Sequence, residues 1–259
     1  MSSCPAVEVP GERSRVARID DLLSAALKDM PRKPPDTVSR EVKKAYSETM
    51  SAKLAVAFGA ELRHRGLRET RPAEPGDLGT SGAERRLAGG IGARKVDVSW
   101  TTEESGLLLA LSIKTINFRD GRTRNFQKNL ANRRGDLVGD ALTLHRRFPY
   151  AVVVGLFFLD KDARRDQTPR RKSTFENTFP RFRLFTGRED PGGRDEQFER
   201  LYVVLVDANP FKPTWECFRA DDPTTPWEFD QVLDDVMELL AERNFDFYEV
   251  DGQGGLRRA

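Results

Sequence analysis

Three apolar runs constrain the fold of this chain most. They are GLLLALSIKTI at residues 106–116, AVVVGLFFL at residues 151–159 and LYVVLVDA at residues 201–208. Runs that lack the alternation of a half-exposed strand are typical of strands covered on both faces. A chain of 259 residues is long enough to bury a sheet of such strands without disulfides or structural metals.

Helical patterns surround these runs. Apolar residues recur every three or four positions in four segments, residues 15–30, 38–64, 125–147 and 227–243. This spacing is typical of amphipathic helices that each lay one face on a sheet. We therefore expect an α/β fold in which a mixed central β-sheet is flanked by helices.

Shorter segments extend the expected sheet. Residues 95–100 alternate in polarity like a half-exposed strand, and we expect them to form a hairpin with residues 106–116. Residues 214–219 and 245–250 predict two further strands, the second of them at an edge.

The remaining segments are polar. Residues 71–92 are rich in Gly, Pro and Glu and predict a surface connection with one helical turn at 83–88. The polar, proline-containing residues 161–199 predict an insertion or binding loop. We divide the chain into an N-terminal helical extension, residues 1–36, and an α/β domain, residues 37–259.

Cysteine and histidine are scarce, which excludes several classes of site. Cys4, Cys217, His64 and His145 are all that the chain has, so a disulfide scaffold and a cysteine-built zinc site are excluded. We expect His145 at the surface, near a helix C-terminus. No apolar stretch approaches about 20 residues and no secretory pattern is visible, so we expect a cytoplasmic protein that does not enter a membrane.

Common nucleotide and hydrolase signatures are missing as well. The chain has no phosphate-binding P-loop and no Gly-x-Ser-x-Gly elbow. Its glycine-rich stretch at residues 89–92 precedes an expected strand, whereas a dinucleotide fingerprint follows one. We interpret these glycines as a flexible approach to the strand.

One group of polar residues lies among the apolar strands. Asp97 interrupts one expected strand, and Ser112 and Lys114 are the strongly polar residues of the next, two positions apart and so on one face. A lysine in an apolar strand needs a partner, and Asp97 on the neighbouring strand can supply it. An Asp carboxylate and a backbone carbonyl, here that of Ile113, can hold Mg²⁺, and a lysine beside them can orient the attacking water in phosphodiester hydrolysis. The alternative interpretation is a structural salt bridge between two strands.

This arrangement resembles the PD-(D/E)xK nuclease superfamily, the fold of many type II restriction endonucleases. In that pattern an Asp precedes a strand that ends in acid–x–Lys. Asp97 matches the first acid and Lys114 matches the lysine, over a resemblance that spans residues 38–160. The resemblance implies a restriction-endonuclease-like core.

Ser112 departs from this pattern because it stands where the second acid is expected, and a serine carries no charge. Some restriction enzymes similarly use Ser-x-Lys and recruit an acid from the following helix, for which this chain offers Asp120, Asp136 and Asp140. The superfamily often adds a glutamate from its first core helix. Glu48 is our preferred candidate on that helix, Glu61 is a second, and Glu84, on the connection, is a further possible metal ligand.

The nearly neutral total charge, +2, hides two regions of opposite sign. Residues 119–172 contain fourteen basic and six acidic residues, whereas residues 228–251 contain nine acidic residues and one basic residue. Basic regions attract phosphate backbones, and Asn, Gln and Arg side chains can read base edges. The residues that we expect to contact DNA lie early in the basic region: Arg124, Asn125, Gln127, Lys128, Asn132, Arg133 and Arg134.

Together, these features predict a Mg²⁺-dependent DNA endonuclease, with Mn²⁺ as a possible substitute, in bacterial restriction or phage defence. Asp97, Ser112, Lys114 and Glu48 would form its catalytic group. Its partner would be double-stranded DNA; cutting both strands favours a homodimer, and a companion methyltransferase is a further possible partner. Two alternatives remain: a non-catalytic nucleic-acid-binding module on the same fold, and an interaction protein whose acidic helix, residues 227–243, docks a partner.

Overall fold

A computed structural model describes residues 18–73 and 85–259 of the chain. Two helices come first, α1 (Arg18–Lys28) and α2 (Arg40–His64), and Ser39 caps the start of α2 because its hydroxyl accepts a hydrogen bond from the Val42 amide. A short hairpin follows, formed by β1 (Arg85–Ala88) and β2 (Ala93–Val96). Cys4 and Glu84 lie outside the described residues.

The rest of the chain alternates strands and helices. In order these elements are β3 (Val98–Thr102), β4 (Gly106–Ile116), α3 (Leu130–His145), β5 (Val152–Asp160), α4 (Thr174–Phe182), β6 (Arg200–Asp207), β7 (Thr214–Arg219), β8 (Asp222–Trp227), α5 (Phe229–Arg243), β9 (Tyr248–Val250) and β10 (Leu256–Arg258). Short 3₁₀ turns precede α3, follow β5 and follow α4. No helix in either described range is long and apolar enough to cross a membrane.

The main sheet has six strands in the order β3-β4-β5-β6-β7-β8. The three apolar runs form its adjacent central strands, because β4, β5 and β6 pair in parallel while the other strands pair antiparallel. The expected mixed central sheet is therefore confirmed. The expected hairpin of residues 95–100 with 106–116 is confirmed for residues 98–100, whereas Lys95 and Val96 pair with β1. The chain is an α/β protein with helices on both faces of a mixed sheet.

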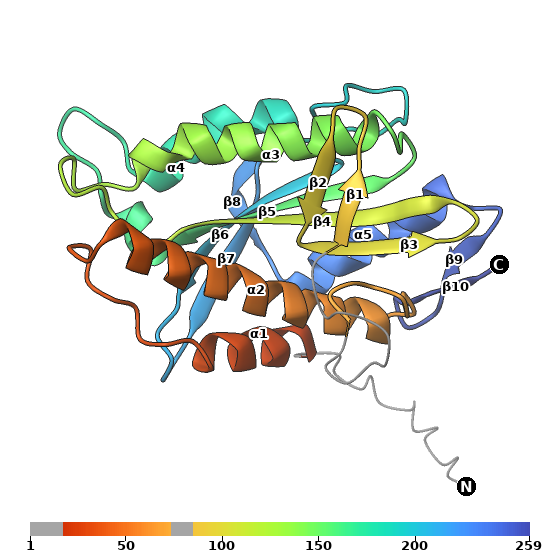
Figure 1. Cartoon of the computed structure of the whole chain (residues 1–259), viewed down its shortest axis with the longest axis horizontal. Helices are drawn as coiled ribbons and strands as arrows, with labels where there is room; N and C mark the ends of the chain where they lie inside the picture. Colours follow the sequence, from red (N-terminus) through yellow and green to blue (C-terminus); the bar gives the residue numbers. More distant parts are fainter. Residues whose placement is uncertain (1–17, 74–84) are drawn as a thin grey trace, which may run out of the picture.

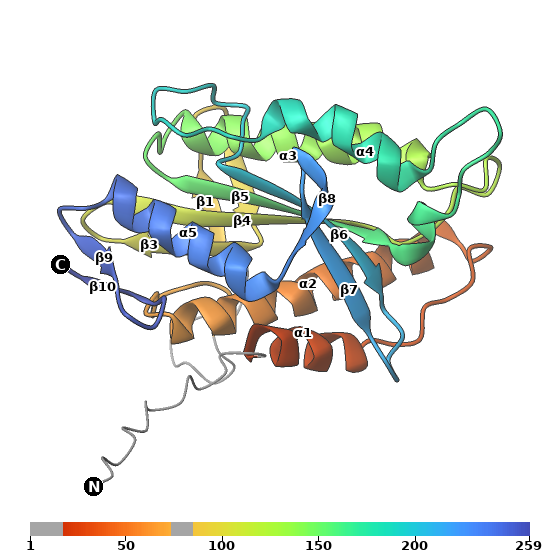
Figure 2. The ribbon, with the colours of Figure 1, turned by 180° about the vertical axis from the view of Figure 1, so that it is seen from behind.

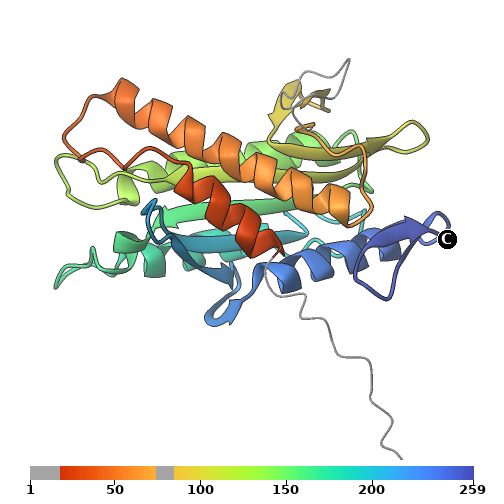
Figure 3. The same ribbon diagram turned by 90° about the horizontal axis from the view of Figure 1, so that it is seen from below.

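Helices cover the two faces of this sheet in two separate hydrophobic clusters. Apolar residues of α1, α2 and α5 pack on one face, and those of α3 and α4 pack on the other (Figure 1). Figure 3 shows α1 and α2 side by side across the first face, and Figure 2 shows α5 along the same sheet with β9 and β10 at its C-terminal end. The expected N-terminal helical extension thus packs into the main core through Ile19, Leu23 and Leu27.

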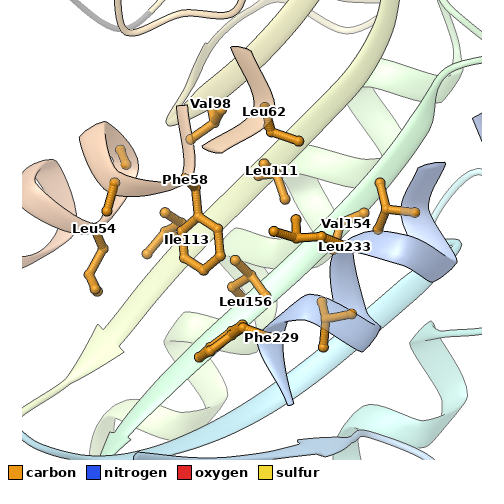
Figure 4. Close-up of a cluster of buried hydrophobic side chains, with 14 of the residues drawn as sticks. Leu54, Phe58, Leu62, Val98, Leu111, Ile113, Val154, Leu156, Phe229 and Leu233 are labelled. Atoms are coloured by element: carbon orange, nitrogen blue, oxygen red, sulfur yellow. The ribbon is translucent and has the colours of Figure 1, made fainter. Parts of the chain in front are cut away.

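Strand alternation along β4 divides its side chains between these clusters. Leu111 and Ile113 lie among Leu54, Phe58 and Leu62 of α2 on the first face (Figure 4). Successive side chains of a strand point to opposite faces, so Ser112 and Lys114 point toward α3. The two polar residues therefore share the face of the sheet that α2 does not cover.

Two expectations about local structure are wrong. Residues 85–88 form strand β1 and not a helical turn, because they pair antiparallel with β2. The expected insertion loop contains helix α4, whose Phe175, Phe179 and Phe182 are buried in the second cluster. Buried Asp166 ties this segment to the core, since it accepts hydrogen bonds from the amides of Phe126 and Thr174 at 3.0 and 2.6 Å.

Candidate active site

Asp97 lies where the chain leaves one sheet and enters another. Val96 pairs with β1 in the hairpin, and Val98 pairs with Leu111 in the main sheet. Strand β3 therefore starts too late to pair with the Ile113 amide. The Asp97 side chain supplies the acceptor that a strand carbonyl would otherwise supply. Its Oδ2 accepts a hydrogen bond from the Ile113 amide at 2.6 Å. The N–H and C=O of one strand residue leave toward the same neighbour, so the Ile113 carbonyl also points to this edge.

Asp140 of α3 completes the polar group. The Ser112 hydroxyl donates a hydrogen bond to Asp140 Oδ2 at 2.7 Å, and the Lys114 ammonium lies 2.9 Å from the same oxygen. Lys114 Nζ lies 3.7 Å from Asp97 Oδ2. Asp97, Ser112, Lys114 and Asp140 thus form one cluster, which we call the Asp–Lys cluster.

The position of Asp140 follows from the helical pattern of α3. Leu137, Ala141 and Leu144 form the stripe that packs on the sheet, and Asp140 lies on that stripe, three residues after Leu137 and four before Leu144. Of the three acids that the sequence offered, only Asp140 joins the cluster. Asp136 is half-exposed and pairs with Arg133, and Asp120 pairs with Lys128.

Electrostatics keep Lys114 charged. Burial by itself would lower the pKa of the Lys114 ammonium, but the carboxylates of Asp140 and Asp97 outweigh burial, so its pKa lies above its ordinary value. The side chains of Asp97 and Lys114 are still 17% and 18% exposed, so the cluster is in contact with solvent.

The glutamates expected to join this site do not do so. Glu48 is two-thirds exposed on α2 and pairs with Lys44 one helical turn earlier. Its expected catalytic role is therefore wrong, because α2 covers the other face of the sheet. Glu61 is buried elsewhere, in ion pairs with Arg65 and Arg18 at 2.9 and 3.2 Å. The structure does not describe Glu84.

The Asp–Lys cluster offers few ligands to a metal. Within residues 18–73 and 85–259, no group of three or more His, Cys, Asp or Glu side chains could hold a metal ion. Mg²⁺, however, is commonly bound through one or two carboxylates and completes its shell with water and substrate phosphates. Asp97, Asp140 and the Ile113 carbonyl are oxygen donors of that kind.

The residues expected to contact DNA lie at and before the start of α3, and their environments differ. Arg124, Lys128 and Asn132 are exposed, whereas Asn125 is buried and accepts a hydrogen bond from the Gln127 amide at 3.0 Å. Arg133 pairs with Asp136 at 3.1 Å, and the Arg134 guanidinium lies over the Phe185 ring. Asn125 therefore shapes the loop, and the exposed side chains remain the candidates for DNA contact.

His145 and Glu199 form a second ionic group that the sequence did not predict. His145 is buried and not at the surface as expected, with Nε2 3.1 Å from Glu199 Oε2. The guanidinium groups of Arg188 and Arg243 lie 2.9 and 2.6 Å from the other Glu199 oxygen. We call this group the Glu199 cluster; its burial indicates a structural role.

Comparison of the chain with protein-family models, with curated proteins and with solved structures finds no significant match to any of them. A functional assignment therefore rests on the geometry of the cluster and on the residues themselves.

Proposed function

We propose that this protein is a metal-dependent endodeoxyribonuclease with a restriction-endonuclease-like core. The observation that carries the proposal is the placement of Asp140. Its carboxylate is bonded to Ser112 and lies 2.9 Å from Lys114, so an acid from the following helix stands where the acid of an acid–x–Lys strand would stand. The order of an Asp, a Ser-x-Lys strand and a helix that returns an acid matches the variant pattern of that superfamily.

The donor set suits a hard divalent cation. Asp97, Asp140 and the Ile113 carbonyl would hold Mg²⁺ or Mn²⁺, because carboxylate and carbonyl oxygens are the ligands that such ions prefer. When bound, such an ion lowers the pKa of coordinated water and neutralises charge that develops on the phosphate. Lys114, held by both carboxylates, would orient the attacking water and stabilise the phosphorane-like transition state. Ser112 would hold Asp140 in place.

The basic residues near the start of α3 would supply the contact with DNA. Arg122, Arg124 and Lys128 are exposed on the turn that follows β4, the strand that carries Ser112 and Lys114. Cations on such a turn attract the phosphate backbone of a duplex.

The acidic helix α5 is less suited to a partner protein than its charge suggested, because Asp230 and Asp234 pair with Arg65 and Asp235 pairs with Arg200.

Cleavage of supercoiled plasmid by the wild-type protein tests the proposal. We expect nicked or linear DNA with Mg²⁺ or Mn²⁺ and intact plasmid with EDTA. Cleavage that persists in EDTA would contradict the metal-dependent reaction.

A second candidate, a non-catalytic DNA-binding module, is favoured by one observation: the ammonium of Lys114 already occupies the oxygen of Asp140 that faces the strand. Gel-shift measurements of binding to linear fragments of the same plasmid distinguish the nuclease from the binding module. DNA binding without cutting in either metal would establish the module and reject the nuclease.

A further inference from the structure

Arg94 is a cation at the rim of the Asp–Lys cluster that no motif predicted. Its Nε lies 3.8 Å from Asp140 Oδ1, the carboxylate oxygen that Lys114 and Ser112 leave to it, and 3.4 Å from the Thr143 hydroxyl. The Arg94 side chain is 44% exposed, whereas the Asp140 side chain is 11% exposed. Arg94 is thus the member of this neighbourhood that an approaching polymer would reach first.

The β1–β2 hairpin lies beside α3 (Figure 1), and its strand β2 carries Arg94. The Gly90 amide donates to the Thr143 carbonyl at 2.9 Å and so satisfies a carbonyl in the last turn of the helix. A Cβ on Gly89 would lie 2.3 Å from the Thr143 methyl group, and a Cβ on Gly90 would lie 2.4 Å from the Arg146 Cβ. The segment is therefore rich in glycine because side chains at these positions would prevent the close contact between the turn and the helix.

The helix is also adapted to this side chain. A Cβ on Gly139 would lie 2.7 Å from Arg94 Nη2, so the absence of a side chain there makes room for the guanidinium. The two contacts that hold the guanidinium are long, and neither matches the bidentate geometry that arginine forms with carboxylates. A group held so loosely keeps most of its donors for another anion.

We infer that Arg94 binds a backbone phosphate of the substrate next to the bond that the Asp–Lys cluster cuts. The inference rests on the proposed function, and it names the hairpin as part of the substrate site. A guanidinium presents its donors in a planar fork that matches phosphate oxygens, and Arg94 carries that fork at the exposed side of the acidic pair. The competing role is structural, in which Arg94 only braces the hairpin against Asp140 and Thr143.

Arg94→Ala and Arg94→Lys test the inference, with Arg86→Ala as the matched control. Arg86 lies on the same hairpin and is exposed, but it pairs with Lys95, the neighbour of Arg94, and so points to the other face. Binding to a DNA duplex is measured in Mg²⁺ over a range of salt concentrations, in a Lys114→Met background that is expected not to cut. Each protein's thermal midpoint is measured alongside.

We expect Arg94→Ala to weaken binding to all duplex sequences alike and to reduce the slope of log K against log salt by about one. Arg94→Lys should keep the slope, because it keeps the charge, but should cut more slowly in the Lys114 protein because it lacks the fork. Arg86→Ala should leave both the salt slope and the rate of cleavage unchanged. A brace that does not touch DNA would change the thermal midpoint without changing the slope.

Two results would overturn the inference while the proposed function stands, provided that the wild type still cuts plasmid in Mg²⁺. One is an unchanged salt slope for Arg94→Ala. The other is a reduction of the salt slope by Arg86→Ala that is as large as the reduction by Arg94→Ala. A wild type that neither binds nor cuts DNA rejects the proposed function itself. The two failures are therefore distinguishable.

Discussion

Asp140→Asn is expected to reduce plasmid cleavage in Mg²⁺ by about 10²- to 10³-fold, the range seen when one preorganised electrostatic group is lost from an active site. The amide keeps the shape of the side chain and its hydrogen bond with Ser112. It removes the negative charge that pairs with Lys114 and that would hold the metal. The measurement is the initial rate of plasmid nicking as Mg²⁺ is varied, and we expect a higher Mg²⁺ requirement as well as a lower maximal rate.

Asp136→Asn is the matched control, because Asp136 lies one helical turn earlier on α3, is half-exposed and pairs with Arg133. It should cut like the wild type. A swap of the acid between positions is a sharper test: Asp140→Ser should be inactive, and Ser112→Glu added to it should restore part of the activity. Equal rates for Asp140→Asn and Asp136→Asn would remove Asp140 from the site.

Glu199→Ala is expected to destabilise the fold by about 3–5 kcal/mol, as is typical when one member of a buried ionic group is removed. Glu199 is fully buried, and its loss would leave the guanidinium groups of Arg188 and Arg243 without the carboxylate that pairs with both of them. The Val153 amide would also lose its acceptor at 2.7 Å. Urea unfolding followed by circular dichroism measures the difference.

Low pH should also reduce the stability that the Glu199 cluster contributes to the fold. Burial raises the pKa of Glu199, but the hydrogen bond and charge of His145 and the charge of Arg243 outweigh burial, so the pKa lies below its ordinary value of 4.5. The stability that ionised Glu199 contributes is therefore complete above about pH 4.5 and is lost as the pH falls through the lower folded-state pKa. Glu199→Gln should lose less stability at acid pH than the wild type loses.

Glu196→Ala serves as control for both measurements, since Glu196 lies on the same connection but forms a partly exposed pair with Arg194. We expect a change of less than about 1 kcal/mol. A Glu199→Ala protein that unfolds at the wild-type urea concentration would show that the Glu199 cluster contributes nothing to stability.

The central part of the fold could be predicted because burial leaves a direct trace in sequence. Strands β4, β5 and β6 are buried on both faces and therefore appear as uninterrupted apolar runs. Edge elements leave a weaker trace. Strand β8 contains Pro223 and Pro226, residues tolerated at a sheet edge but counted against a strand in sequence.

Helix α4 was missed for a different reason. The average polarity of residues 161–199 hid Phe175, Phe179 and Phe182, which recur at helical spacing and form its buried face. Pro180 within the helix further weakened the pattern. A scan for spacing in place of average composition would have found this helix.

The candidate site was predictable only in part. Asp97, Ser112 and Lys114 could be placed together because neighbouring strands and their alternation determine the distance. Asp140 left one usable signal, a charged residue on the apolar stripe of α3. No sequence pattern indicated Arg94. Its position depends on the contact between the glycine turn of the hairpin and α3, and a local sequence pattern does not predict such a contact.

The most direct test of the central claim is plasmid cleavage by Lys114→Met beside Lys44→Met. Methionine keeps an unbranched side chain and removes the ammonium, and the thermal midpoint shows whether each protein is folded. Lys44 is an exposed cation paired with Glu48 on α2, on the other face of the sheet, so it matches the charge change away from both the Asp–Lys cluster and the basic turn. We expect folded Lys114→Met to leave plasmid intact in Mg²⁺ while Lys44→Met and the wild type cut it. Cleavage by folded Lys114→Met at the wild-type rate would contradict the assignment of the Asp–Lys cluster as the active site.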